Sequence, residues 1–183
     1  VPPKNGFKIK GKVEFKNVWL SYNENQFVLK DISFCLEKGE SLAIVGATGS
    51  GKSTIINALC RFYEINKGDI LFDGKSIKDI NKFDLRKQIA LVQQDVFLFS
   101  GKIIDNIRLG NVQMSQEEIK SISIAVNSHN FINNFPLKYE QELIEGGGSI
   151  SSGQRQLLSF ARALAVKPQI LVLDEATSSV DMD

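Results

Sequence analysis

The stretch that decides the fold is Gly46-Ala47-Thr48-Gly49-Ser50-Gly51-Lys52-Ser53-Thr54. It matches the phosphate-binding loop pattern G-x-x-x-x-G-K-[ST]. The apolar residues 42–45 before it predict a buried strand, and apolar residues at helical spacing after it predict a helix starting near Lys52. Glycines let the backbone turn its N–H groups around an anion, and the helix N-terminus adds positive charge beneath the phosphates. The pattern therefore predicts a nucleotide site in which Lys52 reaches the β- and γ-phosphates and the Ser53 hydroxyl ligates Mg²⁺. A glycine-rich turn that only joins a strand to a helix is the alternative.

The composition is that of a soluble globular domain. The chain has 183 residues, 43% of them apolar and 23% charged, with a formal net charge of +1. That balance gives no reason to expect a nucleic-acid partner. Cys35 and Cys60 have no metal-ligand spacing, so we interpret both as reduced packing residues in a cytosolic setting. No run is long enough to span a bilayer, and the start carries no signal-peptide pattern.

The order of the predicted elements indicates an α/β fold. Strands are expected at residues 12–18, 28–34 and 69–72, a short amphipathic helix at 82–87, and an apolar strand at 89–92. A β-rich entry followed by α/β units favours a sheet core with helices on its faces. Residues 101–109, 116–127 and 129–134 all read as helix with no strand between them, which predicts a helical lobe inserted in the core. His129, the single histidine, lies in this lobe, where a surface or packing role is expected.

Two carboxylates follow the last apolar strand, residues 170–173. Asp174 and Glu175 come at the C-terminal end of that strand, which is where an open α/β sheet meets its ligand. Asp174 is expected to hold Mg²⁺ through water, and Glu175 to polarise the water that attacks the γ-phosphate. Two solvated acids at a strand end are the alternative.

Residues 150–156, Ile-Ser-Ser-Gly-Gln-Arg-Gln, lie between the loop and the carboxylates. They resemble the signature motif of ATP-binding cassette (ABC) proteins, whose usual form is L-S-G-G-Q; isoleucine replaces the leucine and Ser152 the first glycine. Physically, a serine and glycine at a helix N-terminus make a second anion site. The resemblance implies that two cassettes pair head to tail, and that Ser151, Ser152, Gly153 and Gln154 cap the ATP on the partner's loop. Without the family, the motif is a capped helix start.

The resemblance extends over nearly the whole chain and assigns further roles. Gln94 matches the Q-loop glutamine, which touches Mg²⁺, acts at the catalytic site and faces the transmembrane domain. Tyr22 matches the aromatic residue that stacks on adenine, although by itself it could be a core aromatic. Ser179 and Asp181 match the D-loop, which crosses the dimer interface.

These residues imply a P-loop NTPase of the ABC type, with an N-terminal antiparallel β region and an inserted α-helical lobe. We expect a linker over 1–11 and the ATPase domain over 12–183, with its core at 12–99 and 154–183 and the lobe at about 100–153. The sequences at residues 96–101 and 153–163 are most similar to those of the ATPase domains of ABC exporters. The implied function is hydrolysis of ATP with Mg²⁺ to drive export, at the cytoplasmic face of a membrane, beside a transmembrane domain and a second nucleotide-binding domain.

The family pattern continues past the D-loop to a γ-phosphate histidine, whereas this sequence stops at Asp183 and His129 precedes the signature. A domain truncated after the D-loop, with slow or absent turnover, is therefore expected. Two rival functions are a soluble ABC ATPase of DNA repair or translation, and a regulatory module that holds ATP without hydrolysing it. Near-neutral charge counts against the first; the presence of Glu175 counts against the second, and the missing histidine counts for it.

Overall fold

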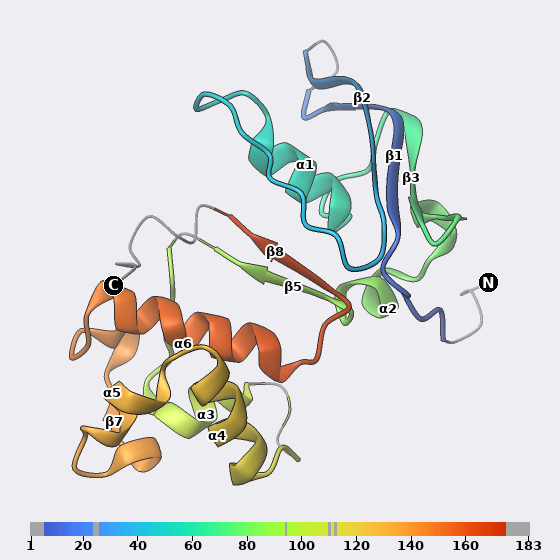
Figure 1. The fold of residues 1–183 in the computed structure, drawn as a ribbon. Coiled ribbons are helices and arrows are strands. Elements are labelled where there is room, and N and C mark those ends of the chain that lie inside the picture. The colour runs from blue at the N-terminus through green and yellow to red at the C-terminus, as the bar shows by residue number, and fades with distance from the viewer. Residues whose placement is uncertain (1–5, 24–25, 94, 110, 112, 175–183) are drawn as a thin grey trace. The chain divides into compact units, whose positions relative to one another are not determined.

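The computed structural model of this chain describes residues 6–23, 26–93, 95–109, 111 and 113–174. Its helices and strands form two compact units, residues 1–89 (unit 1) and residues 90–183 (unit 2). Figure 1 shows the course of the chain through both. Among the described residues, no helix is both long and apolar enough to cross a bilayer.

Unit 1 is built on a four-stranded antiparallel sheet with the strand order β2-β1-β3-β4. The strands are β1 (Val13–Ser21), β2 (Phe27–Leu36), β3 (Lys67–Phe72) and β4 (Lys75–Ser76). The helices of this unit are α1 (Lys52–Leu59), the 3₁₀ turn η1 (Ile77–Asp79) and α2 (Lys82–Arg86). The predicted antiparallel entry region is confirmed.

A bulge in β1 changes which of its side chains face the core. The buried positions are odd before the bulge and even after it: Val13, Phe15, Val18 and Leu20. The register against β3 shifts after Lys16, and Asn17 has a φ of 49°. One extra residue in one strand produces this change of face. Gly68 of β3 lies so close to the bulge that a Cβ atom there would be 2.2 Å from the Asn17 carbonyl oxygen.

The strand predicted over residues 42–45 does not form. These residues have no regular secondary structure, and Val45 is 89% exposed. An apolar segment becomes a strand only when neighbouring strands complete its ladder of hydrogen bonds. The sheet of unit 1 is antiparallel and pairs with none of these residues. The prediction was therefore wrong for this structure, while the helix that it was meant to precede begins at Lys52 as expected.

Unit 2 contains two short sheets and four helices in its described part. The pair β5 (Ile89–Val92) and β8 (Ile170–Leu173) starts at the unit boundary, and β6 (Gly101–Lys102) pairs with β7 (Glu142–Leu143). The helices are α3 (Ile103–Arg108), α4 (Gln116–Ala125), α5 (His129–Asn133) and α6 (Ser152–Ala165). Two 3₁₀ turns, η2 (Lys138–Glu140) and η3 (Glu145–Gly147), connect them.

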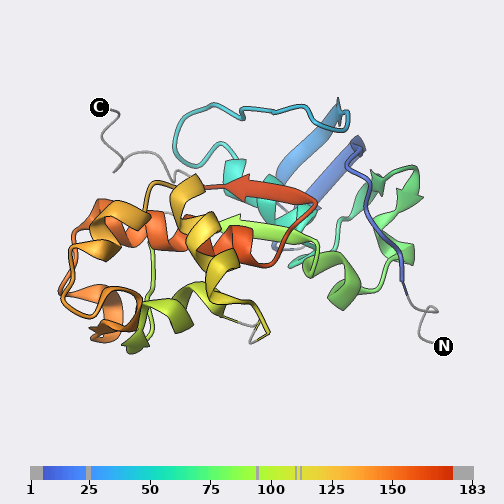
Figure 2. The same ribbon diagram turned by 60° about the horizontal axis from the view of Figure 1, so that its bottom comes forward.

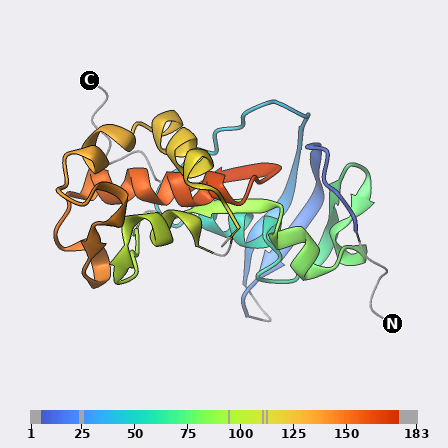
Figure 3. The same cartoon turned by 90° about the horizontal axis from the view of Figure 1, so that it is seen from below.

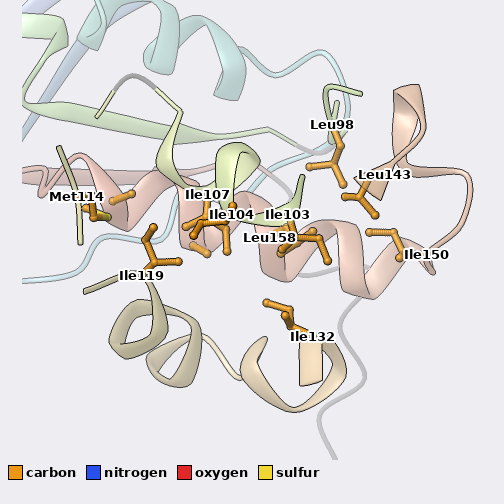
Figure 4. Packing of buried hydrophobic residues seen from close by; sticks show 12 residues of the cluster. Leu98, Ile103, Ile104, Ile107, Met114, Ile119, Ile132, Leu143, Ile150 and Leu158 are labelled. Atoms are coloured by element: carbon orange, nitrogen blue, oxygen red, sulfur yellow. The ribbon is translucent and has the colours of Figure 1, made fainter. Parts of the chain in front are cut away.

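Helix α6 is packed on both sides. One side meets α3 and the segments around α4 and α5 in an apolar cluster that includes Leu98, Ile107, Ile119 and Leu158 (Figure 4). The other side places Phe160 and Ala163 against Ala90 and Val92 of the β5–β8 pair, beside which α6 runs in Figures 2 and 3. The apolar residues of α6 thus pack in two clusters, one on each side of the helix.

The strands predicted at 89–92 and 170–173 are confirmed with the same bounds. The helix predicted from residue 101 begins only at Ile103, because Gly101–Lys102 form the two-residue strand β6, which pairs with β7. Strands this short carry no apolar alternation, so the sequence pattern cannot reveal them. The division into core and lobe remains a prediction.

Candidate nucleotide site

The phosphate-binding loop holds its lysine against its own backbone. Lys52 Nζ donates to the carbonyl oxygens of Gly46, at 2.8 Å, and Ala47, at 3.1 Å, and Ser50 N–H donates to Ala47 O at 3.1 Å. A Cβ atom at Gly46 would lie 2.7 Å from Ser50 Oγ, so a larger residue there would displace the serine hydroxyl. The ammonium group is therefore held against the carbonyl oxygens at the start of its own loop.

The N-terminus of α1 is free to receive negative charge. Its cap residue Gly51 has a φ of 97° and makes no side-chain capping bond, and the first turn holds no acidic residue. The loop residues Thr48, Gly49 and Ser53 are exposed. Uncapped N–H groups and the helix dipole together favour an anion at this end.

Tyr22 lies beside the same helix. Its hydroxyl is 3.0 Å from Thr54 Oγ1 and accepts a hydrogen bond from Asn57 Nδ2 at 3.0 Å. Its ring meets that of Tyr63 edge-on, with the centroids 4.7 Å apart. Tyr22 is nevertheless 43% exposed, so much of its surface remains accessible. The structure thus brings the aromatic residue and the phosphate loop together within unit 1.

In unit 2, the ends of β5 and β8 lie side by side. Asp174 N–H donates to Val92 O at 2.9 Å, which sets the half-buried Asp174 next to the point where the chain leaves β5 through Gln93. Gln94, Glu175, Ser179 and Asp181 lie outside the described residues. The predicted carboxylate strand therefore ends next to the predicted Q-loop.

The signature segment begins α6 with a complete capping box. Ser151 Oγ accepts from Gln154 N–H at 3.2 Å, and Ser151 N–H donates to Gln154 Oε1 at 3.0 Å. The serine hydroxyl acts as acceptor in this pair, so its own proton remains available to a ligand. Ser151 and Ser152 are exposed, Gly153 is half-buried, and the first turn contains no acidic residue. The alternative of a capped helix start is correct as geometry, and the capping serine and the residue after it remain exposed.

A second helix of unit 2 has the same cap without the same electrostatics. Ser115 and Glu118 form the capping box of α4. The first turn of α4 carries Glu117 and Glu118, which repel an anion, whereas that of α6 carries none. The two caps therefore differ in charge and agree in geometry.

His129 packs within the helical region, as expected. Its Nδ1 is 2.8 Å from Tyr139 Oη, and its Nε2 is 2.8 Å from Asn133 Nδ2. Burial raises the pKa of the Tyr139 hydroxyl. Both ring nitrogens are thus engaged with neighbours in the same lobe.

The comparison with protein families decides the identity. The family described as "ABC transporter" matches residues 29–178, which include the phosphate loop, the signature and the carboxylate strand. The chain belongs to the ABC transporter family. Its fold is the P-loop NTPase fold of that family, and such domains bind ATP.

ABC exporters are the relatives that it resembles. It is 49% identical over 173 residues to a probable multidrug resistance ABC transporter ATP-binding/permease protein of Bacillus subtilis, covering 94% of this chain and 26% of that protein. It is 46% identical over 174 residues to a putative multidrug export ATP-binding/permease protein of Staphylococcus aureus, covering 94% and 30%. The solved structure of a bacterial Atm1-family ABC exporter with ATP bound matches the whole chain with a TM-score of 0.93 and 36% identity, over 32% of its own length. The ABC chain thus spans between a quarter and a third of these proteins.

The ABC loop pattern did not reveal every residue near the site. Asn57 bonds Tyr22, and its only sequence signal is its place one turn after Thr54 on the same helix face. Arg155 of α6 donates to Ile150 O at 2.9 Å and so holds the turn that leads into the signature. Contacts of this kind depend on the fold and have no motif.

Proposed function

We propose that this chain is the nucleotide-binding and hydrolysing domain of an ABC exporter. The observation that carries the proposal is the phosphate loop itself, in which Lys52 Nζ is 2.8 Å from Gly46 O at the start of an uncapped helix. The relatives named as multidrug exporters support export as the coupled process. The transported substrate is chosen by the transmembrane part of such proteins.

ATP binding replaces the internal bonds of Lys52. The ammonium group exchanges two neutral carbonyl acceptors for anionic β- and γ-phosphate oxygens, which attract its positive charge more strongly. Backbone N–H groups from Thr48 to Thr54 surround the phosphates, and the exposed face of Tyr22 stacks on adenine.

Ser53, Asp174 and Gln94 are the proposed protein donors to Mg²⁺, because hydroxyl, carboxylate and amide oxygens are ligands that this ion prefers. Ser53 is exposed on the first turn of α1, Asp174 ends β8, and Gln94 follows β5. The described residues contain no group of three histidine, cysteine or acidic side chains that would hold a metal by themselves. Mg²⁺ is commonly held by one or two protein oxygens together with phosphates and water, and it neutralises charge on the phosphates when bound. Glu175 accepts a proton from the attacking water.

Hydrolysis requires two copies of the domain in this proposal. The outward hydroxyl of Ser151 and the first N–H groups of α6 form an anion site without a nucleotide of their own in the same chain. They cap the γ-phosphate on a partner's loop in a head-to-tail dimer. Gln94 and the helical lobe face the transmembrane domain at the cytoplasmic side of the membrane.

Calorimetry on this chain tests the phosphate loop. Lys52→Ala should abolish measurable ATP binding, because it removes the fixed cation beside the phosphates. Lys120→Ala, on the exposed face of α4, is the matched control and should bind like the parent. Equal ATP affinity of Lys52→Ala and the parent would contradict the loop assignment. In the full-length protein, Glu175→Gln should bind ATP and lose turnover, and normal phosphate release from it would contradict the role of Glu175.

A further inference from the structure

Arg162 is a half-buried cation that serves neither the phosphate loop nor the signature turn. It lies on α6, and its guanidinium donates three hydrogen bonds: Nε to Asn106 O at 3.0 Å, Nη2 to Asn106 Oδ1 at 2.9 Å and Nη1 to Phe97 O at 2.9 Å. It also lies over the ring of Phe99, with Cζ 5.5 Å from the centroid. The ion pairs found among the described residues do not include Arg162. The guanidinium group therefore binds only backbone and amide oxygens between residues 97 and 106.

Asn106 of α3 completes this arrangement. It is 3% exposed, and its amide is used fully. Oδ1 accepts from Phe99 N–H at 3.0 Å as well as from Arg162, and Nδ2 donates to Phe99 O at 2.9 Å and Lys102 O at 3.2 Å. Both lone pairs and both amide protons have partners. A buried amide satisfied in this way fixes the backbone that it contacts.

The segment that these two residues hold has no regular secondary structure. Residues 97–99 belong to no strand or helix, so no ladder fixes their backbone. Leu98 anchors the segment in the apolar cluster beside α6 (Figure 4), and apolar packing by itself leaves the direction of the backbone less restricted. A cavity of about 260 Å³, lined by residues including Gln93, Phe97 and Arg162, borders the same segment. The bonds from Arg162 and Asn106 therefore set its course.

We propose that Arg162 and Asn106 are positioning residues that tie segment 97–99 to α6, so that the chain leaving β5 and the helix carrying Ser151 move as one piece. The tie rests on the proposed function, because both ends of it lead to residues of the ATPase site. Arg162 lies 11 positions after Ser151, about 16 Å along a rigid helix. When segment 97–99 moves, α6 therefore moves with it, and so does Ser151 at the start of α6, which faces the partner's nucleotide in the proposed dimer.

Turnover of the full-length protein tests the tie. Arg162→Lys keeps the charge and the stem but cannot make the three-bond fork. Its kcat for ATP hydrolysis should fall at least tenfold, while its ATP Kd stays within twofold of the parent, since the nucleotide is held in unit 1. The double variant Arg162→Lys/Asn106→Leu should fall no further than the worse single variant, because the two residues act as one unit. Arg108→Lys, two positions after Asn106 on α3, is the matched control and should retain kcat.

Two results would overturn the tie: a kcat of Arg162→Lys within twofold of the parent, or effects of Arg162→Lys and Asn106→Leu that multiply. Hydrogen exchange in the unmodified protein keeps the proposal testable if a variant fails to fold. On addition of ATP, exchange at the Phe99 and Gln154 amides should change together, by the same factor within about twofold. Independent changes would also refute the tie. If the unmodified protein binds ATP without hydrolysing it, the proposed hydrolytic function is refuted. The exchange measurement would still test whether Arg162 and Asn106 couple segment 97–99 to α6.

Discussion

Two serines of this chain allow stability and nucleotide contact to be separated. Ser151 and Ser115 each cap a helix of unit 2 by the same reciprocal box, with the serine hydroxyl accepting from the third N–H at 3.2 Å in both cases. Replacing either by alanine removes an equivalent cap. The two variants should therefore lose similar free energy of unfolding, about 1 kcal/mol. For a domain of this size that lowers Tm by roughly 2–4 °C.

Only one of the two variants should lose activity. In the proposed dimer, Ser151 also donates its free proton to a charged phosphate oxygen, and such a bond contributes about 1.5–3 kcal/mol. At 1.4 kcal/mol for each tenfold, Ser151→Ala should lower kcat/KM for ATP hydrolysis by about 10- to 150-fold. Ser115 precedes Glu117 and Glu118, which exclude an anion, so Ser115→Ala should stay within about twofold of the parent.

The assay is phosphate release by the full-length protein at several ATP concentrations, with thermal unfolding measured on the same preparations. The reasoning is refuted if both variants lose activity in proportion to their loss of Tm, because the serine would then act only as a cap. It is refuted equally if Ser151→Ala has the Tm of a lost cap and unchanged kcat/KM. A large loss of activity in Ser115→Ala alone would indicate that α4, and not α6, contacts the partner's nucleotide.

The remaining predictions concern unit 1. Tyr22→Ala should weaken ATP binding by roughly 1–2 kcal/mol, about the value of one aromatic stack. Tyr22→Phe should lose only the hydroxyl contacts to Thr54 and Asn57, so it should bind ATP more tightly than the alanine variant. Equal affinities of the two variants, measured by calorimetry, would contradict stacking. Gly68→Ala should destabilise the protein far more than Gly74→Ala in thermal unfolding, because both have φ near 80° but only at Gly68 would Cβ meet backbone, 2.2 Å from Asn17 O. Similar Tm values would show that the bulge at Asn17 relaxes without cost.

Much of the candidate site is predictable because its patterns are local. The loop pattern rests on the spacing of Gly46, Gly51 and Lys52, and the structure shows a φ of 97° at Gly51 and the internal bonds of the lysine. The runs at 89–92 and 170–173 are continuous and apolar, and both form strands. Short-range chemistry of this kind is written in a few adjacent residues.

The rest depends on residues far apart in the sequence. Tyr22 meets Thr54 across 32 positions, and Arg162 meets Asn106 across 56, so no window of sequence contains either pair. The bulge at Asn17 shifts the buried face of β1 by one residue, which a simple alternation cannot foresee. The failed strand at 42–45 has the same origin, because its stability lies in partner strands and not in its own apolar residues.

The signature shows how a local rule and a family pattern give different answers to one sequence. From the residues alone, a serine three positions before a glutamine predicts a capped helix, and the cap of Ser151 and Gln154 is present. The cap does not explain why the first turn of α6 is free of acidic residues, since the same cap on α4 tolerates two of them. Acidic residues in a first turn stabilise a helix through its dipole, so their absence from α6 forgoes stability at the one helix end where the proposed dimer places a phosphate. In the proposed dimer, that difference between two caps of the same geometry leaves the start of α6 without a charge that would repel the partner's phosphate.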